Sequence, residues 1–107
     1  MKQQMYRQGD VLLIPIKATG FGKEPFKAVA PTNDRIVLAF GEATGHHHSL
    51  KANVGTLFER EEKRYLRMDI DAPLEHQEHG AILIPRGTYQ VVIQREYHPE
   101  AIRNVAD

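Results

Sequence analysis

Three consecutive histidines, His46 to His48, lie in the middle of a chain that contains only six. If residues 45–51 form a strand, His46 and His48 point to one face and His47 to the other. Residues i and i+2 of a strand are roughly 6.5–7 Å apart, so two imidazoles on one face can bind the same ion. The spacing therefore predicts His46 and His48 as a pair of metal ligands, with His47 directed away from the ion.

A second histidine-rich segment, residues 75–79, reads Glu-His-Gln-Glu-His. We expect His79 and His76 to complete the site, and Glu75 and Glu78 are further oxygen donors. A set of nitrogen and oxygen ligands without sulfur suits Zn²⁺, Fe²⁺, Mn²⁺ or Ni²⁺. The two segments together predict a divalent transition-metal site, with the identity of the ion left open.

The function that follows from such a site is a small metal-binding protein, possibly a metal-dependent enzyme acting on a small molecule. An ion held by two or three protein ligands keeps a position for water or substrate. The catalytic residue stays unknown, with Glu78 as the candidate. A metal-free acid/base enzyme that pairs Glu78 with His46 or His79 is one alternative.

The other alternative is a metal-free binding or self-assembly module. In that case the histidines face water, and exposed strand edges pair with a partner chain. Loss of His46 or His48 would then leave assembly and melting unchanged. We expect a homo-oligomer.

The composition limits the class of protein. A chain of 107 residues predicts one domain, residues 1–107. Lys+Arg and Asp+Glu both number 14, which argues against nucleic-acid binding driven by a strong positive field. The sequence lacks cysteine and any apolar run long enough for a signal peptide or membrane span. We therefore expect a cytoplasmic protein with no membrane or nucleic-acid partner.

Apolar residues recur with a period of two over short segments, as in strands. In residues 35–40, for example, Ile36, Leu38 and Phe40 share one face. The charged residues 60–63 predict a hairpin tip, and Pro85-Arg86-Gly87 predicts a second hairpin. The predicted strands span residues 11–16, 35–40, 45–51, 56–59, 63–70, 82–84 and 88–97.

The remaining segments complete an all-β prediction. Pro15 cannot donate to a neighbouring strand, so we expect its strand at an edge or at a bulge. Residues 20–31 are predicted as a loop whose Phe21 and Phe26 fold back onto the strands. Residues 98–105 form at most one short C-terminal helix. The fold class is a small antiparallel β-barrel or sandwich.

The last predicted strand separates two kinds of side chain. Tyr89, Val91 and Ile93 form an apolar face that we expect to point inward. Solvent is the ordinary surrounding for the polar row opposite them, but inside a small barrel that row would line a pocket and hold a cofactor or substrate. The polar row consists of Gln90, Gln94 and Glu96.

Residues 41–90 resemble the two motifs of the cupin family. The first motif, a glycine, a spacer, His-x-His and a later glycine, is matched by Gly41, His46, His48 and Gly55. The second, a glycine, a spacer and Pro-x-Gly, is matched by Gly80, Pro85 and Gly87. The resemblance implies a small β-barrel with a metal ion at its centre, held by His46 and His48. It also places Gln90 at the position of the second motif's histidine.

Overall fold

The computed structural model describes residues 4–17, 26–40 and 46–94, and these residues form strands with one short 3₁₀-helix. The all-β prediction is therefore confirmed for this part of the chain. The elements are β1 (Tyr6–Gln8), β2 (Val11–Pro15), β3 (Lys27–Val29), β4 (Arg35–Phe40), β5 (His47–Lys51), η1 (Ala52–Val54), β6 (Gly55–Arg60), β7 (Lys63–Met68), β8 (Ala72–Leu74), β9 (Ile82–Ile84) and β10 (Gly87–Ile93).

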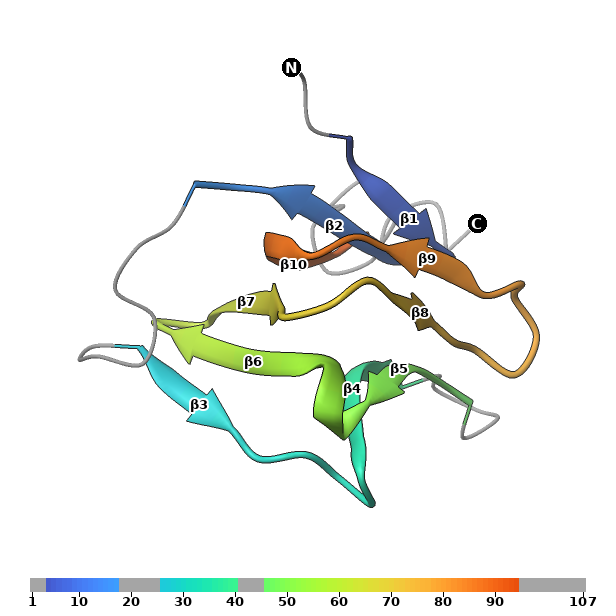
Figure 1. Cartoon of the computed structure of the whole chain (residues 1–107), viewed down its shortest axis with the longest axis horizontal. Helices are drawn as coiled ribbons and strands as arrows, with labels where there is room; N and C mark the ends of the chain where they lie inside the picture. The colour runs from blue at the N-terminus through green and yellow to red at the C-terminus, as the bar shows by residue number, and fades with distance from the viewer. Residues whose placement is uncertain (1–3, 18–25, 41–45, 95–107) are drawn as a thin grey trace, which may run out of the picture.

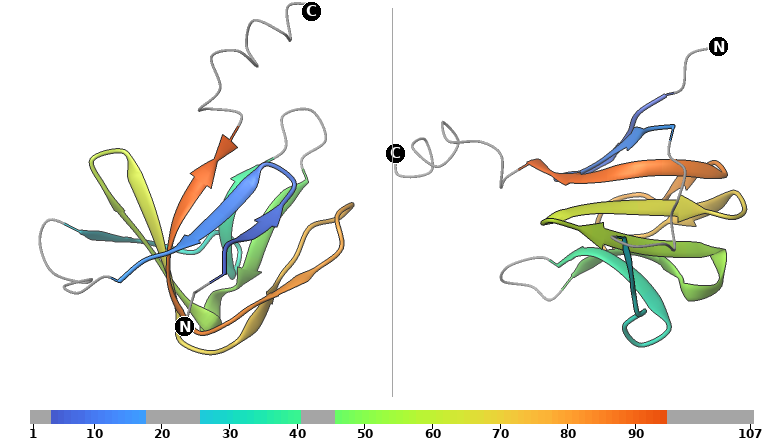
Figure 2. Two further views of the ribbon diagram at one scale, coloured as in Figure 1. Left: turned by 90° about the horizontal axis from the view of Figure 1, so that it is seen from above. Right: turned by 90° about the vertical axis from the view of Figure 1, so that its left-hand side faces the viewer.

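The strands form an open antiparallel sandwich (Figure 1). The larger sheet has the order β1-β2-β10-β7-β6-β3, and the pairs β4-β5 and β8-β9 lie apart from it. Paired backbone hydrogen bonds between Ser49 and Glu75 join β5 to the segment after β8. Figure 2 shows the larger sheet and these smaller pairs from two further sides. The described strands do not close into a barrel, so the sandwich alternative of the prediction fits.

The core fills the space between the sheets. Strand alternation directs every second side chain inward, and the inward set is apolar because its burial removes it from water. On β10 the inward residues are Tyr89, Val91 and Ile93, as predicted. The fully buried apolar side chains come from both layers: Val11, Leu13, Leu38, Leu50, Leu66, Met68, Leu74 and Ile84.

The charged tip predicted at residues 60–63 is confirmed. Arg60 of β6 pairs with Lys63 of β7, and Glu61 and Glu62 form the turn between them. Both turn residues have positive φ, at 52° and 71°. Two positive φ values are typical of a type I′ turn, whose twist matches that of the strands it joins.

The predicted hairpin at Pro85-Arg86-Gly87 is wrong. β9 pairs with β8, and β10 pairs instead with β2 and β7 of the larger sheet. These three residues therefore carry the chain from one sheet to the other. Turn-forming residues show that the chain changes direction, but which strand it then joins depends on long-range pairing.

Two predictions near the N-terminus also need correction. β2 lies between β1 and β10, so it is not an edge strand. β1 pairs with β2 only as far as Leu13, and Pro15 lies beyond that point, where no β1 partner needs its missing N–H group. Within the predicted loop of residues 20–31, residues 27–29 form β3 against β6. Phe26 folds back as expected, edge-on to Tyr65 at 5.5 Å between ring centroids, and Phe21 lies outside the described residues.

A β-bulge in β4 overturns the predicted face of Phe40. The register with β5 shifts between Val37 and Ala39, so that Ala39 pairs with His48 and Phe40 with His47. An extra residue in one strand reverses the alternation beyond it. Phe40 therefore lies on the outer face beside His47 and is 55% exposed, whereas Leu38 is fully buried.

The helix expected at residues 98–105 lies outside the described residues. Within the described ranges, no helix has the length and apolar character needed to cross a membrane.

Candidate functional site

Four histidines from two distant segments gather at one end of the sandwich. The centroid of the His76 ring lies 4.3 Å from that of His48 and 5.7 Å from that of His46. The His79 ring lies 4.6 Å from His76 and 5.8 Å from His48. The structure thus brings together all four residues that the sequence analysis singled out as metal ligands, and we call them the histidine cluster.

Backbone pairing explains why the two segments meet. Ser49 and Glu75 exchange hydrogen bonds of 2.9 and 2.8 Å between their main chains. This pair holds the start of residues 75–79 beside β5. Alternation along β5 then directs His48 inward with the fully buried Leu50, and His48 itself is only 7% exposed.

His48 is oriented by a buried glutamine that the sequence analysis did not identify. The side-chain nitrogen of Gln8 donates to the carbonyl oxygens of Leu74 and Gly80, both at 2.9 Å. Those two bonds determine which end of the amide carries the oxygen, and that oxygen lies 2.8 Å from Nδ1 of His48. Because the amide oxygen only accepts, Nδ1 must carry the proton. In the neutral ring, Nε2 is then the nitrogen with the lone pair.

His46 has a comparable arrangement at the surface. Its Nδ1 lies 3.1 Å from Oε2 of Glu78, whose side chain is 64% exposed. A carboxylate oxygen accepts a hydrogen bond at this distance, so Nδ1 donates and Nε2 keeps its lone pair when the ring is neutral. Histidines that bind metal ions commonly donate their other ring N–H group to an oxygen in this way.

His76 has the opposite arrangement. Its Nδ1 accepts hydrogen bonds from the backbone N–H groups of Glu78 and His79, at 3.0 and 3.1 Å. The neutral ring therefore carries its proton on Nε2. Burial lowers the pKa of His76, and the positive charges of His79, His46 and His47 lower it further, against a smaller opposing effect of Glu78. His76 is consequently a neutral N–H donor inside the cluster.

Gly9, in the turn between β1 and β2, gives the cluster its space. A Cβ atom at this position would lie 2.8 Å from Nε2 of His79 and 3.1 Å from Cε1 of His48. The residue also has a φ of +56°, which glycine adopts without strain. The two imidazoles therefore pack directly on the backbone of this turn.

The donor chemistry of the cluster suits a transition metal, but the side chains do not yet surround one point. Within residues 4–17, 26–40 and 46–94, no three His, Asp or Glu side chains are arranged to hold a metal ion. The direction of His76 accounts for part of this, since its Nδ1 is bonded to the backbone and its Nε2 is protonated. The neutral rings of His46 and His48 instead carry their lone pair on Nε2, the nitrogen through which such a ring binds a metal ion.

His47 belongs to a separate network on the outer face of β5. Its backbone N–H group donates to Oε1 of Gln77 at 2.8 Å, and its Nδ1 lies 3.0 Å from Oγ of Ser49. Arg35 donates to the same hydroxyl at 3.0 Å and to Oε1 of Glu75 at 2.6 Å. This network braces residues 75–77 against β4 and β5. It also separates His47 from the cluster, as strand alternation predicted.

The polar row of the last predicted strand lies elsewhere. Gln90 pairs with Ile14 and Tyr65 and points to the face opposite Tyr89 and Val91, which lie in the core. The place that the cupin resemblance assigns to a fourth ligand is therefore on the outer face of the larger sheet. The backbone N–H group of Gln94 donates to the carbonyl oxygen of Asp10 at 2.9 Å. Glu96 lies outside the described residues.

Comparison with known proteins gives one family. The model of a domain of unknown function, DUF8820, matches residues 7–94. No curated protein and no solved structure is significantly similar to the chain.

Proposed function

The chain belongs to the DUF8820 family, and we propose that it binds a divalent transition-metal ion through His46, His48 and His79. The observation that carries the proposal is the hydrogen bond between Gln8 and His48. A buried amide, held by two carbonyl groups, keeps Nδ1 of His48 protonated and directs the lone-pair nitrogen away from Gln8. Such a bond in a metal site orients the imidazole and raises its basicity as a ligand.

Each residue of the cluster has its own part in this proposal. His46, held by Glu78, and His48, held by Gln8, are the oriented ligands. His79 completes the set after a change of side-chain rotamer, because nitrogen–metal distances of about 2 Å require closer convergence. His76 does not ligate, because its Nδ1 is occupied by the backbone. This assignment narrows the four expected ligands to three.

A site of this kind also suits a metal-dependent enzyme acting on a small molecule. Bound Zn²⁺ or Fe²⁺ supplies a Lewis acid. The Nε2–H group of His76 would donate a hydrogen bond to a substrate oxygen, and Glu78, which is exposed, would exchange protons with solvent. We propose that the protein works in the cytosol, because the chain has no cysteine and so cannot form the disulfides that are common in oxidising compartments.

Metal titration of untagged protein tests the proposal. We expect wild-type protein to bind Zn²⁺ in calorimetry and to give the visible spectrum of a nitrogen-ligated ion with Co²⁺. His48→Ala and His79→Ala should each weaken Zn²⁺ binding at least about tenfold, because each removes one ligand. The control variants His47→Ala and Gln90→Ala should bind as the wild type does. Wild-type protein that retains no Zn²⁺ or Co²⁺ after desalting would contradict the proposal.

Exposed apolar side chains support the second candidate, a self-assembly module. A contiguous patch of exposed apolar residues favours association, and four large apolar side chains are each more than half exposed. Light scattering during size-exclusion chromatography, with and without EDTA, distinguishes the candidates. Assembly that persists without metal and in His48→Ala would favour the module. The residues concerned are Met5, Phe40, Ile70 and Leu83.

A further inference from the structure

Two backbone hydrogen bonds set the register in which the two histidine segments meet. Ser49 and Glu75 exchange these bonds, as a hydrogen-bonded pair of an antiparallel ladder does. The next residues along the two segments, His48 and His76, then face each other, and their ring centroids lie 4.3 Å apart. Continued one residue at a time, the same register gives two further pairs: His47 with Gln77, and His46 with Glu78.

At the first of these further pairs, a side chain takes over from the backbone. N–H groups of alternate residues point to the same edge of a strand, so the N–H group of His47 faces the same edge as that of Ser49. Residues 77–79 form a bend at this point. The acceptor for the N–H group of His47 is therefore the side-chain oxygen of Gln77, at 2.8 Å. One exposed amide extends the register beyond the last backbone pair.

The nitrogen of the same amide contacts the His47 ring. Because Oε1 of Gln77 accepts from the backbone, its Nε2 is the end that lies 3.3 Å from Nε2 of His47. An amide nitrogen only donates, so the ring nitrogen accepts, and the neutral ring carries its proton on Nδ1, toward Oγ of Ser49. Both ends of the Gln77 amide thus hold one residue of β5.

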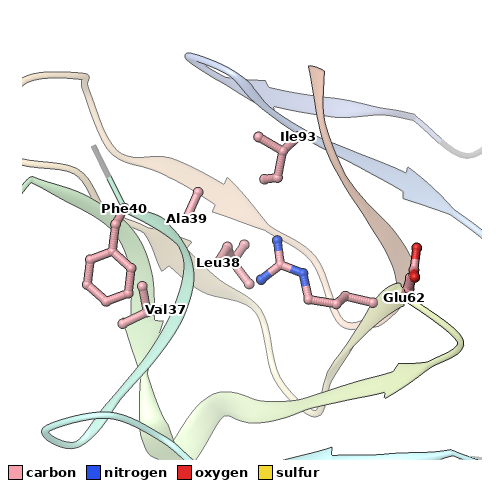
Figure 3. Close-up of a pocket in the computed structure, with 7 residues that line it drawn as sticks. Val37, Leu38, Ala39, Phe40, Glu62 and Ile93 are labelled. Carbon is pink, nitrogen blue, oxygen red and sulfur yellow. The ribbon is translucent and has the colours of Figure 1, made fainter. Parts of the chain in front are cut away.

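His47 is the fixed side of this contact. On the other edge of β5, it pairs with Phe40 of β4, and His48 pairs with Ala39. Figure 3 shows Ala39 and Phe40 on β4, at the wall of a cavity of about 430 Å³ that no described residue of 75–79 lines. Residues 76–79, in contrast, lie outside any strand. Gln77 therefore positions its own segment against β5.

The ion pair between His46 and Glu78 depends most on this alignment. It lies one residue beyond the contact of Gln77 on both segments, and the side chain of Glu78 is 64% exposed. An exposed pair of this kind contributes little by itself, because two side chains must be held in one geometry in competition with water. The ring of His48 is held differently, by the buried Gln8 of β1.

We propose that Gln77 is a positioning residue of the metal site and acts through His46. Its amide keeps the two segments in register, which brings Glu78 to Nδ1 of His46 and leaves the lone pair of that ring on Nε2. Gln77 itself does not ligate. The proposal rests on the proposed function, to which it adds the residue that aligns the exposed half of the site.

Imidazole NMR of EDTA-treated protein tests the alignment without metal. At about pH 8 histidine rings are neutral, and long-range proton–nitrogen spectra show which nitrogen carries the proton. Gln77→Met keeps the length of the side chain but loses both amide contacts, so His46 should change from Nδ1–H to a mixture of tautomers. His48 should keep Nδ1–H, which shows that the variant is folded. Gln77→Glu keeps an acceptor oxygen for the N–H group of His47 and should restore the wild-type spectrum of His46.

Zn²⁺ titration tests the consequence for binding. Gln77→Met should weaken Zn²⁺ binding about three- to tenfold, as for the loss of one or two hydrogen bonds. His47→Ala should bind as the wild type does, because it keeps the backbone N–H group from which Gln77 accepts. Gln90→Met is the matched control and should also leave the affinity unchanged. In the His46→Ala background, Gln77→Met should lower the affinity less than about twofold, because the residue through which it acts is gone.

Three results would overturn the proposal. They are an unchanged His46 spectrum in Gln77→Met, an equal disturbance of His46 and His48, and an undiminished effect of Gln77→Met on Zn²⁺ affinity in the His46→Ala background. Wild-type protein that retains no Zn²⁺ would contradict the proposed function instead. The imidazole spectra would still decide whether Gln77 aligns His46 with Glu78.

Discussion

The side-chain oxygen of Gln8 lies 2.8 Å from Nδ1 of His48, although the two residues are 40 positions apart in the chain. The same amide donates to the carbonyl oxygens of Leu74 and Gly80, at either end of the segment that carries His76 and His79. One buried glutamine thus joins both histidine segments to β1. Its substitution should affect both the stability of the fold and the binding of metal.

Gln8→Leu tests this relationship. Leucine has a side chain of similar size to glutamine, but it leaves His48 Nδ1 and the carbonyl groups of Leu74 and Gly80 without this partner. We expect the free energy of unfolding to fall by about 2–4 kcal/mol, because unsatisfied buried polar groups are costly. Zn²⁺ affinity should fall about 10- to 100-fold, as for loss of a group that orients a metal ligand. Urea denaturation and calorimetry measure the two effects.

The matched control is Gln4→Leu, since Gln4 is exposed and lies two residues before the first residue of β1, Tyr6. It should change neither quantity appreciably. A Gln8→Leu protein as stable as the wild type would show that the bonds of Gln8 do not organise the cluster.

The histidine at position 76 predicts a pH dependence of stability. Its pKa lies below the ordinary value of 6.5 in the folded state, first through burial and then through the charges of His79, His46 and His47, with Glu78 opposing. Above about pH 6.5 the ring is neutral in both states and contributes no slope. As the pH falls below that value, the unfolded chain takes up the proton first, so the free energy of unfolding decreases until the pH has passed the folded pKa.

His76→Asn separates this titration from the backbone contacts. An asparagine oxygen can accept from the N–H groups of Glu78 and His79 as Nδ1 does, but it does not titrate. Urea denaturation of the EDTA-treated variant should show a shallower loss of stability between about pH 6.5 and 5. Superimposable pH profiles of the variant and the wild type would refute this prediction.

Two glycines predict opposite responses to the same substitution. A Cβ atom on Gly55 would lie 2.2 Å from the carbonyl oxygen of Arg67, whereas one on Gly80 would meet nothing within 4 Å. Gly55→Ala should therefore cost about 2 kcal/mol or more, because the backbone of β6 or β7 must move. Gly80→Ala should change stability by less than about 1 kcal/mol and serves as the control. Thermal melts of the two variants that shift equally would contradict this account.

The hairpin tip predicts a stabilising change. Glu61 and Glu62 both have positive φ, a conformation that costs about 1 kcal/mol or more for most residues. Glu61→Asn with Glu62→Gly provides the pair preferred in type I′ turns and should stabilise the fold by about 1 kcal/mol. In the other turn with two positive φ values, Asn33 already occupies the first position, so Asp34→Gly should give a smaller gain. Equal urea midpoints for the hairpin variant and the wild type would argue against strain at the tip.

Local alternation explains most of what the sequence predicted correctly. Tyr89, Val91 and Ile93 face the core, and His47 is separated from His46 and His48, because successive side chains of any strand point to opposite faces. The rule fails at Phe40, where a bulge reverses it. The composition of residues 35–40 does not predict the bulge, which arises in the pairing of β4 with β5.

Alternation within single strands does not determine which distant segments pair. The sequence of Pro85 to Gly87 predicts a hairpin, yet these residues connect two sheets, because β10 pairs with β2 and β7 instead of with β9. The burial of Gln8 could not be predicted from the sequence for a similar reason. A polar residue in a short strand ordinarily faces water, and its burial at 3% exposure follows only from the carbonyl groups and imidazole that the fold brings to it.

By itself, the sequence determined that the chain is all-β and which histidines of the central tract share a face. Both follow from the backbone geometry of single strands, which neighbouring residues decide. Only the tertiary structure decided that His76 and His79 meet His48, and that the neutral rings of His48 and His46 carry their protons on the sides that face Gln8 and Glu78. The orientations of His48 and His46 depend on hydrogen bonds to Gln8 and Glu78 in separate segments, and such bonds exist only once the sheets have packed. The orientation of His76, in contrast, depends on backbone N–H groups within its own loop.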